Sequence, residues 1–166
     1  MEKFEFDDIS FSEDTRILYE GHHVNGMDLA PEAFPLFMTS AFNMGNLDDV
    51  EHTYDTKGYT YIRTRNPNRK ALADVLTYLE QGKDTLIFSS GMGAITTTYF
   101  ALLQPGDHMI CNENIYGETF DAITSLVKNY GVTTTFVPFD DLDAVKAAVQ
   151  PNTKMLYTEV ASNPTD

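Results

Sequence analysis

From residue 66 onward, helical and strand-like patterns alternate along the sequence, and this alternation constrains the fold more than any other feature. The first helical pattern begins at Pro67, a residue suited to the first turn of a helix, and ends before Gly82. The strand-like segments are short continuous apolar runs, as expected of strands covered on both faces. The expected helices are 67–80, 91–106, 117–131 and 140–150, and the expected strands are 84–90, 108–113, 132–139 and 154–161.

Four strand–helix alternations indicate a mostly parallel sheet with right-handed crossovers, and therefore an α/β fold. Local signals mark two helix ends: Gly131 suits a C-terminal cap, and Asp140 or Asp141 suits the N-cap of the last helix. The chain stops at Asp166, soon after the last expected strand and without a covering helix. We therefore expect the sheet to be truncated.

Residues 1–55 show no sustained helical or alternating pattern, and Pro31 and Pro35 interrupt their one apolar stretch, 31–42. We interpret this region as an extended arm whose apolar side chains cover another surface, with a second subunit as one candidate. The expected organisation is an N-terminal arm and subunit-contact segment over 1–65, followed by an α/β domain over 66–166.

The charge balance excludes several classes of partner. With 11 basic and 25 acidic side chains the formal net charge is −14, whereas phosphate backbones and anionic membrane surfaces need a basic footprint. No apolar run reaches the ~18 residues of a membrane span, and the acidic start lacks the features of a signal peptide. We therefore expect a cytoplasmic protein that binds neither nucleic acid nor membrane.

Disulfide and metal chemistry have little support in the sequence. Cys111 is the only cysteine, which rules out an internal disulfide, and in a buried strand it is most simply a small core residue. The four histidines are an adjacent pair, His22 and His23, and two scattered residues, His52 and His108. We expect no metal site.

The most informative loop is Ser89–Gly93, between an expected strand and an expected helix. Ligands of open α/β sheets lie at the carboxyl ends of the strands, and the N–H groups at a helix start can hold an anion. The loop is neither a Walker loop nor a G-x-G-x-x-G fingerprint. A tight turn without a ligand is the alternative interpretation.

Two further elements could contact an anionic, planar ligand. Tyr61 and Arg63 are two residues apart, so in an extended segment a phenol and a guanidinium would face one phosphate or carboxylate together. Tyr116, before Gly117 at a strand end, could stack on a planar ring. The alternatives are a solvated surface pair and a tyrosine in ordinary packing contact.

Four motifs in order, GYTYIRTRNPN, FSSGMGAI, NENIYGETF and EVASNPT, resemble the pyridoxal-phosphate enzymes of Cys/Met metabolism. This family includes cystathionine γ-synthase, cystathionine β- and γ-lyases, methionine γ-lyase and the O-acylhomoserine sulfhydrylases. The resemblance runs from about Thr15 to the last residue. It implies a fold-type I, aspartate aminotransferase-like large domain, and pyridoxal 5′-phosphate as the cofactor.

The resemblance also implies roles at the phosphate of the cofactor. Gly91 and Met92 match the backbone donors to that phosphate, and Ser89 lies just before them. Tyr61 and Arg63 match a pair that reaches the same phosphate from the neighbouring subunit. Family members accordingly form homo-oligomers, either dimers or tetramers built from two dimers.

At the cofactor ring, Tyr116 matches a tyrosine that stacks on the pyridine and helps to move protons, and Asn163 matches an asparagine near the ring hydroxyl. Glu118 departs from the pattern, because methionine γ-lyases typically carry cysteine there, and it counts against that activity. The lysine that binds the cofactor covalently and the aspartate that pairs with the pyridine nitrogen both follow Asn163 in the family. We therefore expect this 166-residue chain alone to be inactive.

Three hypotheses about function follow. The first is the N-terminal part of a pyridoxal-phosphate-dependent carbon–sulfur lyase or trans-sulfuration enzyme, catalysing β- or γ-elimination or γ-replacement on cystathionine, methionine or an O-acylhomoserine. The second is a non-catalytic remnant of that fold, which binds an anion or oligomerises. The third is a phosphate-binding α/β module of unrelated chemistry.

Overall fold

A computed structural model describes residues 12–19 and 33–162 of the chain. These residues belong to two compact units, 1–87 and 88–166, and each unit is described by itself. The boundary expected after residue 65 divides the sequence by its pattern, and it stays a prediction.

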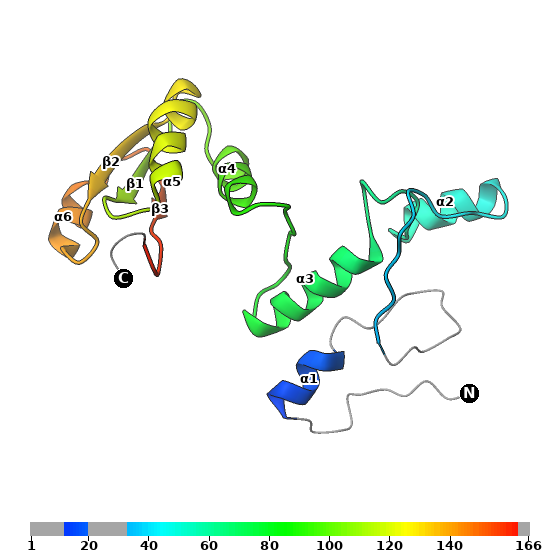
Figure 1. The fold of residues 1–166 in the computed structure, drawn as a ribbon. Helices are drawn as coiled ribbons and strands as arrows, with labels where there is room; N and C mark the ends of the chain where they lie inside the picture. Colours follow the sequence, from blue (N-terminus) through cyan, green and yellow to red (C-terminus); the bar gives the residue numbers. More distant parts are fainter. Residues whose placement is uncertain (1–11, 20–32, 163–166) are drawn as a thin grey trace. The chain divides into compact units, whose positions relative to one another are not determined.

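The second unit contains a parallel sheet of three strands, β1 His108–Asn112, β2 Thr133–Val137 and β3 Thr153–Tyr157, in the order β2-β1-β3 (Figure 1). His108 pairs with Thr133 of β2, and Met109 pairs with Met155 of β3. The central strand β1 is buried from His108 to Cys111. The expected α/β fold with parallel strands is therefore confirmed.

Four helical segments accompany this sheet in the described part of the second unit. They are α4 Gly91–Leu102, α5 Gly117–Asp121, the π-helical η2 Ala122–Val127 that directly continues α5, and α6 Leu142–Ala147. The helices expected at 91–106, 117–131 and 140–150 are confirmed, although each ends a few residues earlier or begins later than its sequence pattern. α5 with η2 connects β1 to β2, and α6 connects β2 to β3, which supplies the crossovers that parallel strands require.

Two of the expected helix caps are present. Gly131 has a φ of +93°, its N–H donates to the Lys128 carbonyl at 3.0 Å, and the next N–H donates to the Val127 carbonyl at 3.3 Å. This pair of bonds is the Schellman arrangement, which favours glycine because the left-handed conformation crowds a Cβ atom. Asp141, one of the two candidates for the last cap, accepts from two N–H groups in the first turn of α6.

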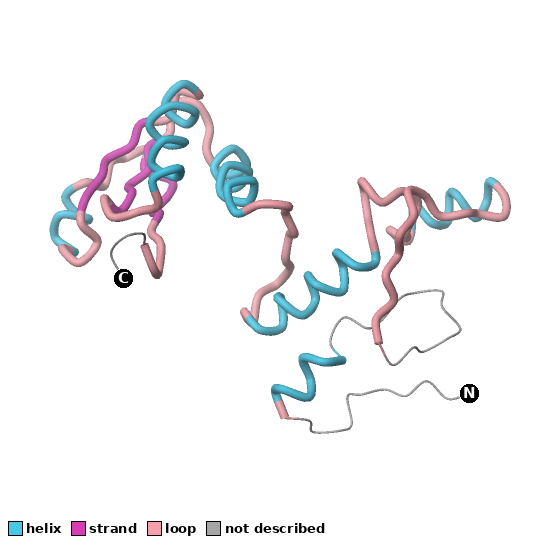
Figure 2. Tube along the Cα trace, viewed as in Figure 1, coloured by secondary structure: helices cyan, strands magenta, loops and turns pink. Residues whose placement is uncertain are grey.

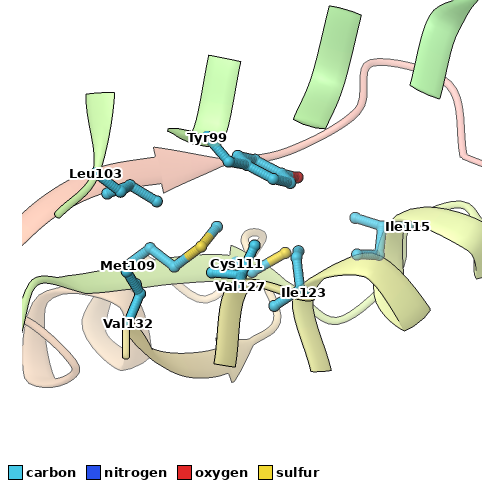
Figure 3. Packing of buried hydrophobic residues seen from close by; sticks show 8 residues of the cluster. All are labelled: Tyr99, Leu103, Met109, Cys111, Ile115, Ile123, Val127 and Val132. Atoms are coloured by element: carbon cyan, nitrogen blue, oxygen red, sulfur yellow. The ribbon is translucent and has the colours of Figure 1, made fainter. Parts of the chain in front are cut away.

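The core of the second unit is formed by side chains from α4, β1 and η2 (Figure 3). Tyr99 and Leu103 point from the end of α4 toward Met109 and Cys111 of β1. Burying one large apolar side chain contributes about 1.5–3 kcal/mol, so this cluster holds the end of α4 and η2 firmly against the sheet. The cluster consists of Tyr99, Leu103, Met109, Cys111, Ile115, Ile123, Val127 and Val132.

The strand expected at 84–90 is wrong. These residues run without regular structure between α3 (Pro67–Leu79) and α4, and Leu86 is 78% exposed (Figure 2). The apolar run predicted burial, but a strand also needs a neighbouring backbone. Residues 84–89 make no ladder hydrogen bond with any strand in the described ranges.

The first unit contains α1 Glu13–Tyr19, α2 Leu47–Asp55 and α3, which confirms the helix expected at 67–80. α1 and α2 correct the expectation of an extended arm over residues 1–55. The Asn46 side chain accepts from the Asp49 N–H at 2.9 Å, and α2 has no buried residue. Local capping therefore starts α2, and its apolar stripe of Leu47, Val50 and Tyr54 lies at helical spacing but is not buried.

Residues 33–45 do lack regular structure, apart from an isolated antiparallel bridge between Ala41 and Tyr61. Their aromatic rings form a continuous row from Phe34 to Tyr59 through Phe37 and Phe42, with centroids 5.7–6.3 Å apart. The Asn68 amide at the start of α3 pins this segment, accepting from the Phe37 N–H and donating to the Pro35 carbonyl, both at 2.9 Å.

Candidate functional site

The start of α4 presents backbone donors at the carboxyl end of the sheet. Ser90 is the N-cap residue, and its hydroxyl accepts from the Gly93 N–H at 3.0 Å. The N–H groups of Gly91 and Met92 are the first of the helix, so no carbonyl of their own helix can reach them. A Cβ atom at Gly91 would meet nothing within 4 Å, so this backbone is open to an approaching anion.

Tyr116 lies at the start of α5, and its side chain is 42% exposed. The next turn of α5 carries the buried Thr119, whose hydroxyl lies 4.0 Å from the sulfur of Met92. The first residues of α4 and α5 are therefore neighbours. The structure brings the Ser89–Gly93 loop together with the helix start that carries Tyr116, as expected of loops at one edge of a parallel sheet.

A carboxylate that sequence reasoning missed connects these elements. Glu159 follows β3, and its Oε2 accepts from the Tyr116 N–H at 2.8 Å. Its Oε1 accepts from the hydroxyls of Thr119 and Tyr157, each at 3.2 Å. Glu159 stands in the motif EVASNPT, two residues after the end of β3, and an acid near the carboxyl end of a strand is the signal that could have identified it.

The charge and burial around Glu159 change the acidity of neighbouring groups. Burial raises the pKa of the Tyr157 phenol, and the Glu159 charge raises it further. Burial, with the Glu159 charge as second cause, raises the pKa of the Cys111 thiol to about 12. At neutral pH Cys111 is therefore a thiol and not a nucleophilic thiolate, in agreement with its interpretation as a core residue.

Tyr99 lies beside this network with a buried hydroxyl that makes no hydrogen bond in the described part of the chain. Its ring meets the Tyr157 ring edge-on at 5.3 Å between centroids. Burial raises the pKa of the Tyr99 phenol, and Tyr157 is the next cause. Tyr99 is thus a neutral packing residue, and the charge of the network resides on Glu159.

Tyr61 and Arg63 belong to the first unit. The Arg63 guanidinium carbon lies 4.9 Å from the centre of the Tyr61 ring, a cation–π distance. The segment is a turn rather than the extended chain we expected, because the Thr64 and Arg65 N–H groups both donate to the Tyr61 carbonyl. The two side chains nevertheless lie together, as predicted.

An open hollow of about 440 Å³ surrounds this pair, lined by Tyr61, Ile62, Arg63, Asn66 and Arg69. The Arg69 guanidinium donates to the carbonyls of Ile62 and Arg63, at 2.7 and 3.3 Å, and so fixes the turn. This hollow combines a phenol with two guanidinium groups, which suits an anion. Its pairing with the Ser89–Gly93 loop stays a prediction.

The remaining predictions concern Asn163, metal binding and membrane spans. Asn163, His22 and His23 lie outside the described residues. Within residues 12–19 and 33–162, no three His, Cys, Asp or Glu side chains gather as metal ligands would. Over the same ranges, every helix is too short or too polar to be a membrane span.

Known proteins resemble this chain over most of its length. The sequence model described as Cys/Met metabolism PLP-dependent enzyme matches residues 14–166. Cystathionine beta-lyase MetC of Bacillus subtilis is 43% identical over 131 residues, which are 79% of this chain and 32% of that protein.

Solved structures also resemble this chain over most of its length. Cystathionine gamma-lyase from Lactobacillus plantarum, complexed with L-serine, matches with a TM-score of 0.80 and 32% identity. A structure described as O-acetylhomoserine (thiol)-lyase from Campylobacter jejuni, with N′-pyridoxyl-lysine-5′-monophosphate, matches with a TM-score of 0.81 and 29% identity. Each match covers 93% of this chain and 38% of the other. The chain thus spans 32–38% of the length of these relatives.

Proposed function

The chain belongs to the Cys/Met metabolism PLP-dependent enzymes, and we propose that it is the N-terminal part of a carbon–sulfur lyase or trans-sulfuration enzyme. The observation that carries this proposal is the 4.0 Å contact between Thr119 and Met92, which places the start of α4 beside the helix start of Tyr116. An anion site and an aromatic ring then serve one ligand that has both a phosphate and a planar ring.

The residues present fit pyridoxal 5′-phosphate. The N–H groups of Gly91 and Met92 would hold the phosphate with the Ser89 hydroxyl, since the backbone at Gly91 is open. The half-exposed Tyr116 ring would stack on the pyridine, and Asn163 would lie near the ring hydroxyl. When bound, the cofactor supplies an electron sink for carbanions at the α- and β-carbons of the substrate.

The residues of this chain would orient the ligand and move protons. The α4 donors would hold the phosphate end of the cofactor, and Tyr116 would orient its ring. The Tyr116 phenol is exposed, and it can hold or pass a proton beside the ring. Glu159 holds the backbone from which that ring projects.

The proposed substrate is a sulfur-containing amino acid or an activated homoserine, undergoing β- or γ-elimination or γ-replacement. Three relatives named for cystathionine or O-acetylhomoserine support this class. The exposed Glu118 in the first turn of α5 disfavours methionine γ-lyase activity, as its departure from that pattern implies.

We also propose a cytoplasmic homo-oligomer, a dimer or tetramer, in which Tyr61 and Arg63 of one subunit reach the phosphate held by another. The hollow around Tyr61 suits an anion, and Leu36 and Met38, in the segment that bridges to Tyr61 through Ala41, are 80% and 94% exposed. Exposed apolar side chains of this size favour a covering partner surface.

The test is a titration of this chain with pyridoxal 5′-phosphate, followed by absorbance and by equilibrium dialysis. Gly91→Pro removes one N–H donor at a position where helices accept proline, and it should weaken binding about tenfold or more.

Leu142→Pro is the matched control, because Leu142 is the first residue of α6, far from the α4 donors in sequence, and is exposed. Saturable binding that only Gly91→Pro weakens supports the proposal. Equal binding by Gly91→Pro and the wild type would contradict the phosphate site. Binding of inorganic phosphate but not of the cofactor would favour the non-catalytic alternative.

A further inference from the structure

One helix start in the second unit depends on a residue far along the chain. α4 and α6 are capped by their own N-cap side chains, Ser90 and Asp141. α5 is not, because its N-cap residue is Tyr116, whose side chain makes no capping hydrogen bond. The Tyr116 N–H instead donates to Glu159, 43 residues later, at 2.8 Å.

The carboxylate of Glu159 accepts three donors with two oxygens. Oε2 serves Tyr116 alone, and Oε1 serves the hydroxyls of Thr119 and Tyr157. A carboxylate has about four acceptor positions and no donor, so it can satisfy all three groups at once. A glutamine would offer one acceptor oxygen, and its NH₂ group would face a donor.

The N-terminal side of Tyr116 is held by Ile115, which is buried in the core, and its C-terminal side is packed less tightly. The following residue is Gly117, around which a Cβ atom would meet nothing within 4 Å, so packing does not confine the backbone on that side. The Tyr116 ring is itself 42% exposed. The hydrogen bond that fixes the Tyr116 N–H therefore adds a restraint on the direction of the ring.

Glu159 also couples this backbone to the phosphate-binding start of α4. The same Oε1 that accepts from Tyr157 accepts from Thr119, and the Thr119 hydroxyl touches the Met92 sulfur. One carboxylate after β3 thus links the starts of two helices. Both helices carry donors or rings that the proposed cofactor site uses.

We infer that Glu159 is a positioning residue that fixes the backbone of Tyr116 and thereby aims its ring across the cofactor site. This inference takes the identity of the ligand from the proposed function. The hydrogen bond between Glu159 and Tyr116 does not depend on that function. Glu159 acts through Tyr116 and Thr119, and it does not touch the reacting atoms.

The first measurement is amide hydrogen exchange at Tyr116 in this chain without any cofactor. Glu159→Leu removes every acceptor and should speed exchange at Tyr116 about tenfold or more, and Glu159→Gln should give a smaller increase. Tyr157→Phe is the matched control, because it removes one donor to Oε1 and leaves the bond to Tyr116. It should change exchange at Tyr116 less than about twofold.

The second measurement separates positioning from stability. At saturating pyridoxal 5′-phosphate, Glu159→Gln should keep the dissociation constant within about threefold, since the α4 donors still hold the phosphate. The induced circular dichroism of the cofactor should fall by about half or more, because the stacked ring has lost its fixed direction. Tyr157→Phe should keep the wild-type spectrum.

Exchange at Tyr116 that stays within about twofold of the wild type in both Glu159 variants would overturn the inference. An unchanged dichroism spectrum in Glu159→Gln would do the same. If the wild-type chain binds no cofactor, the proposed function fails, while the exchange measurement still decides whether Glu159 fixes Tyr116.

Discussion

The hydroxyl of Thr119 lies 4.0 Å from the sulfur of Met92 and 3.2 Å from the carboxylate of Glu159. Thr119 is fully buried, so this contact is shielded from water. It joins the start of α4, the start of α5 and the end of β3. Three segments that are far apart in the sequence thereby form one edge of the sheet.

Replacing Thr119 by valine keeps its volume and removes its hydroxyl. We expect the free energy of unfolding to fall by about 0.5–1.5 kcal/mol, because Glu159 loses one donor in a buried position. Urea denaturation measures this. Thr124→Val is the control, since the Thr124 hydroxyl bonds a carbonyl of its own helix and the residue is exposed. Equal losses in the two variants would argue against a special role for Thr119.

His108 should make the stability of the chain depend on pH. It is fully buried in β1, between the hydroxyls of Thr153 and Thr135 at 2.8 Å, and burial lowers its pKa. The unfolded histidine, with a pKa near ~6.5, then binds protons more readily than the folded one. Stability should be full above that pH and be lost as the pH falls toward the folded pKa.

The measurement is the free energy of unfolding between about pH 5 and pH 8. His108→Gln should flatten the slope of this free energy against pH, even if the variant is less stable than the wild type at every pH. His52→Gln, on the exposed surface of α2, should leave the slope unchanged. If His108→Gln keeps the wild-type slope of unfolding free energy against pH, the pH dependence comes from other groups.

Gln81 has a φ of +49°, in the left-handed region that favours glycine. It ends α3 in the same arrangement as Gly131 ends its helix, because the Gly82 N–H donates to the Thr77 carbonyl at 2.9 Å. Gln81→Gly should raise stability by about 0.5–1 kcal/mol. Glu80→Gly, one residue earlier in the right-handed region, should lower it. Thermal unfolding compares the stability of the two variants. A lower stability in Gln81→Gly would contradict backbone strain at Gln81.

Asn68 anchors the segment 33–42 through two hydrogen bonds to backbone groups. Asn68→Ala should free that segment and cost about 1–2 kcal/mol of local stability. Limited proteolysis with chymotrypsin, which cleaves after aromatic residues, should then cut faster at Phe34 and Phe37. Asn129→Ala, an exposed site near the end of the helix that follows Tyr116, is the control. Unchanged cleavage rates would show that the aromatic row alone holds the segment.

Arg63 and Gly91 should act across a subunit interface. Arg63→Ala and Gly91→Pro should each weaken cofactor binding. Mixing the two variants should restore about a quarter of the sites, because half of the random dimers then carry one site with both wild-type residues. The bound stoichiometry of pyridoxal 5′-phosphate measures this. No restoration on mixing, with subunit exchange verified, would place both residues in one chain.

The sequence by itself determined the features that depend on neighbouring residues. Pro67 and Asn66 start α3, Asp141 starts α6 and Gly131 ends the helix before β2, because caps are hydrogen bonds within a few residues. The alternation of patterns determined the parallel sheet, and the motifs placed Gly91, Met92 and Tyr116 in loops at its carboxyl edge. Short-range rules sufficed for each of these.

Only the tertiary structure decided which distant groups meet. The apolar run at 84–90 has no neighbouring strand in the described ranges, and the Asn46 cap starts α2 although none of its residues is buried. Glu159 accepts from the N–H of Tyr116, 43 residues earlier, and no short-range pattern in either segment predicts this pair. A hydrogen bond between remote residues exists only once the sheet has ordered its strands as β2-β1-β3, which brings the end of β3 beside the start of α5.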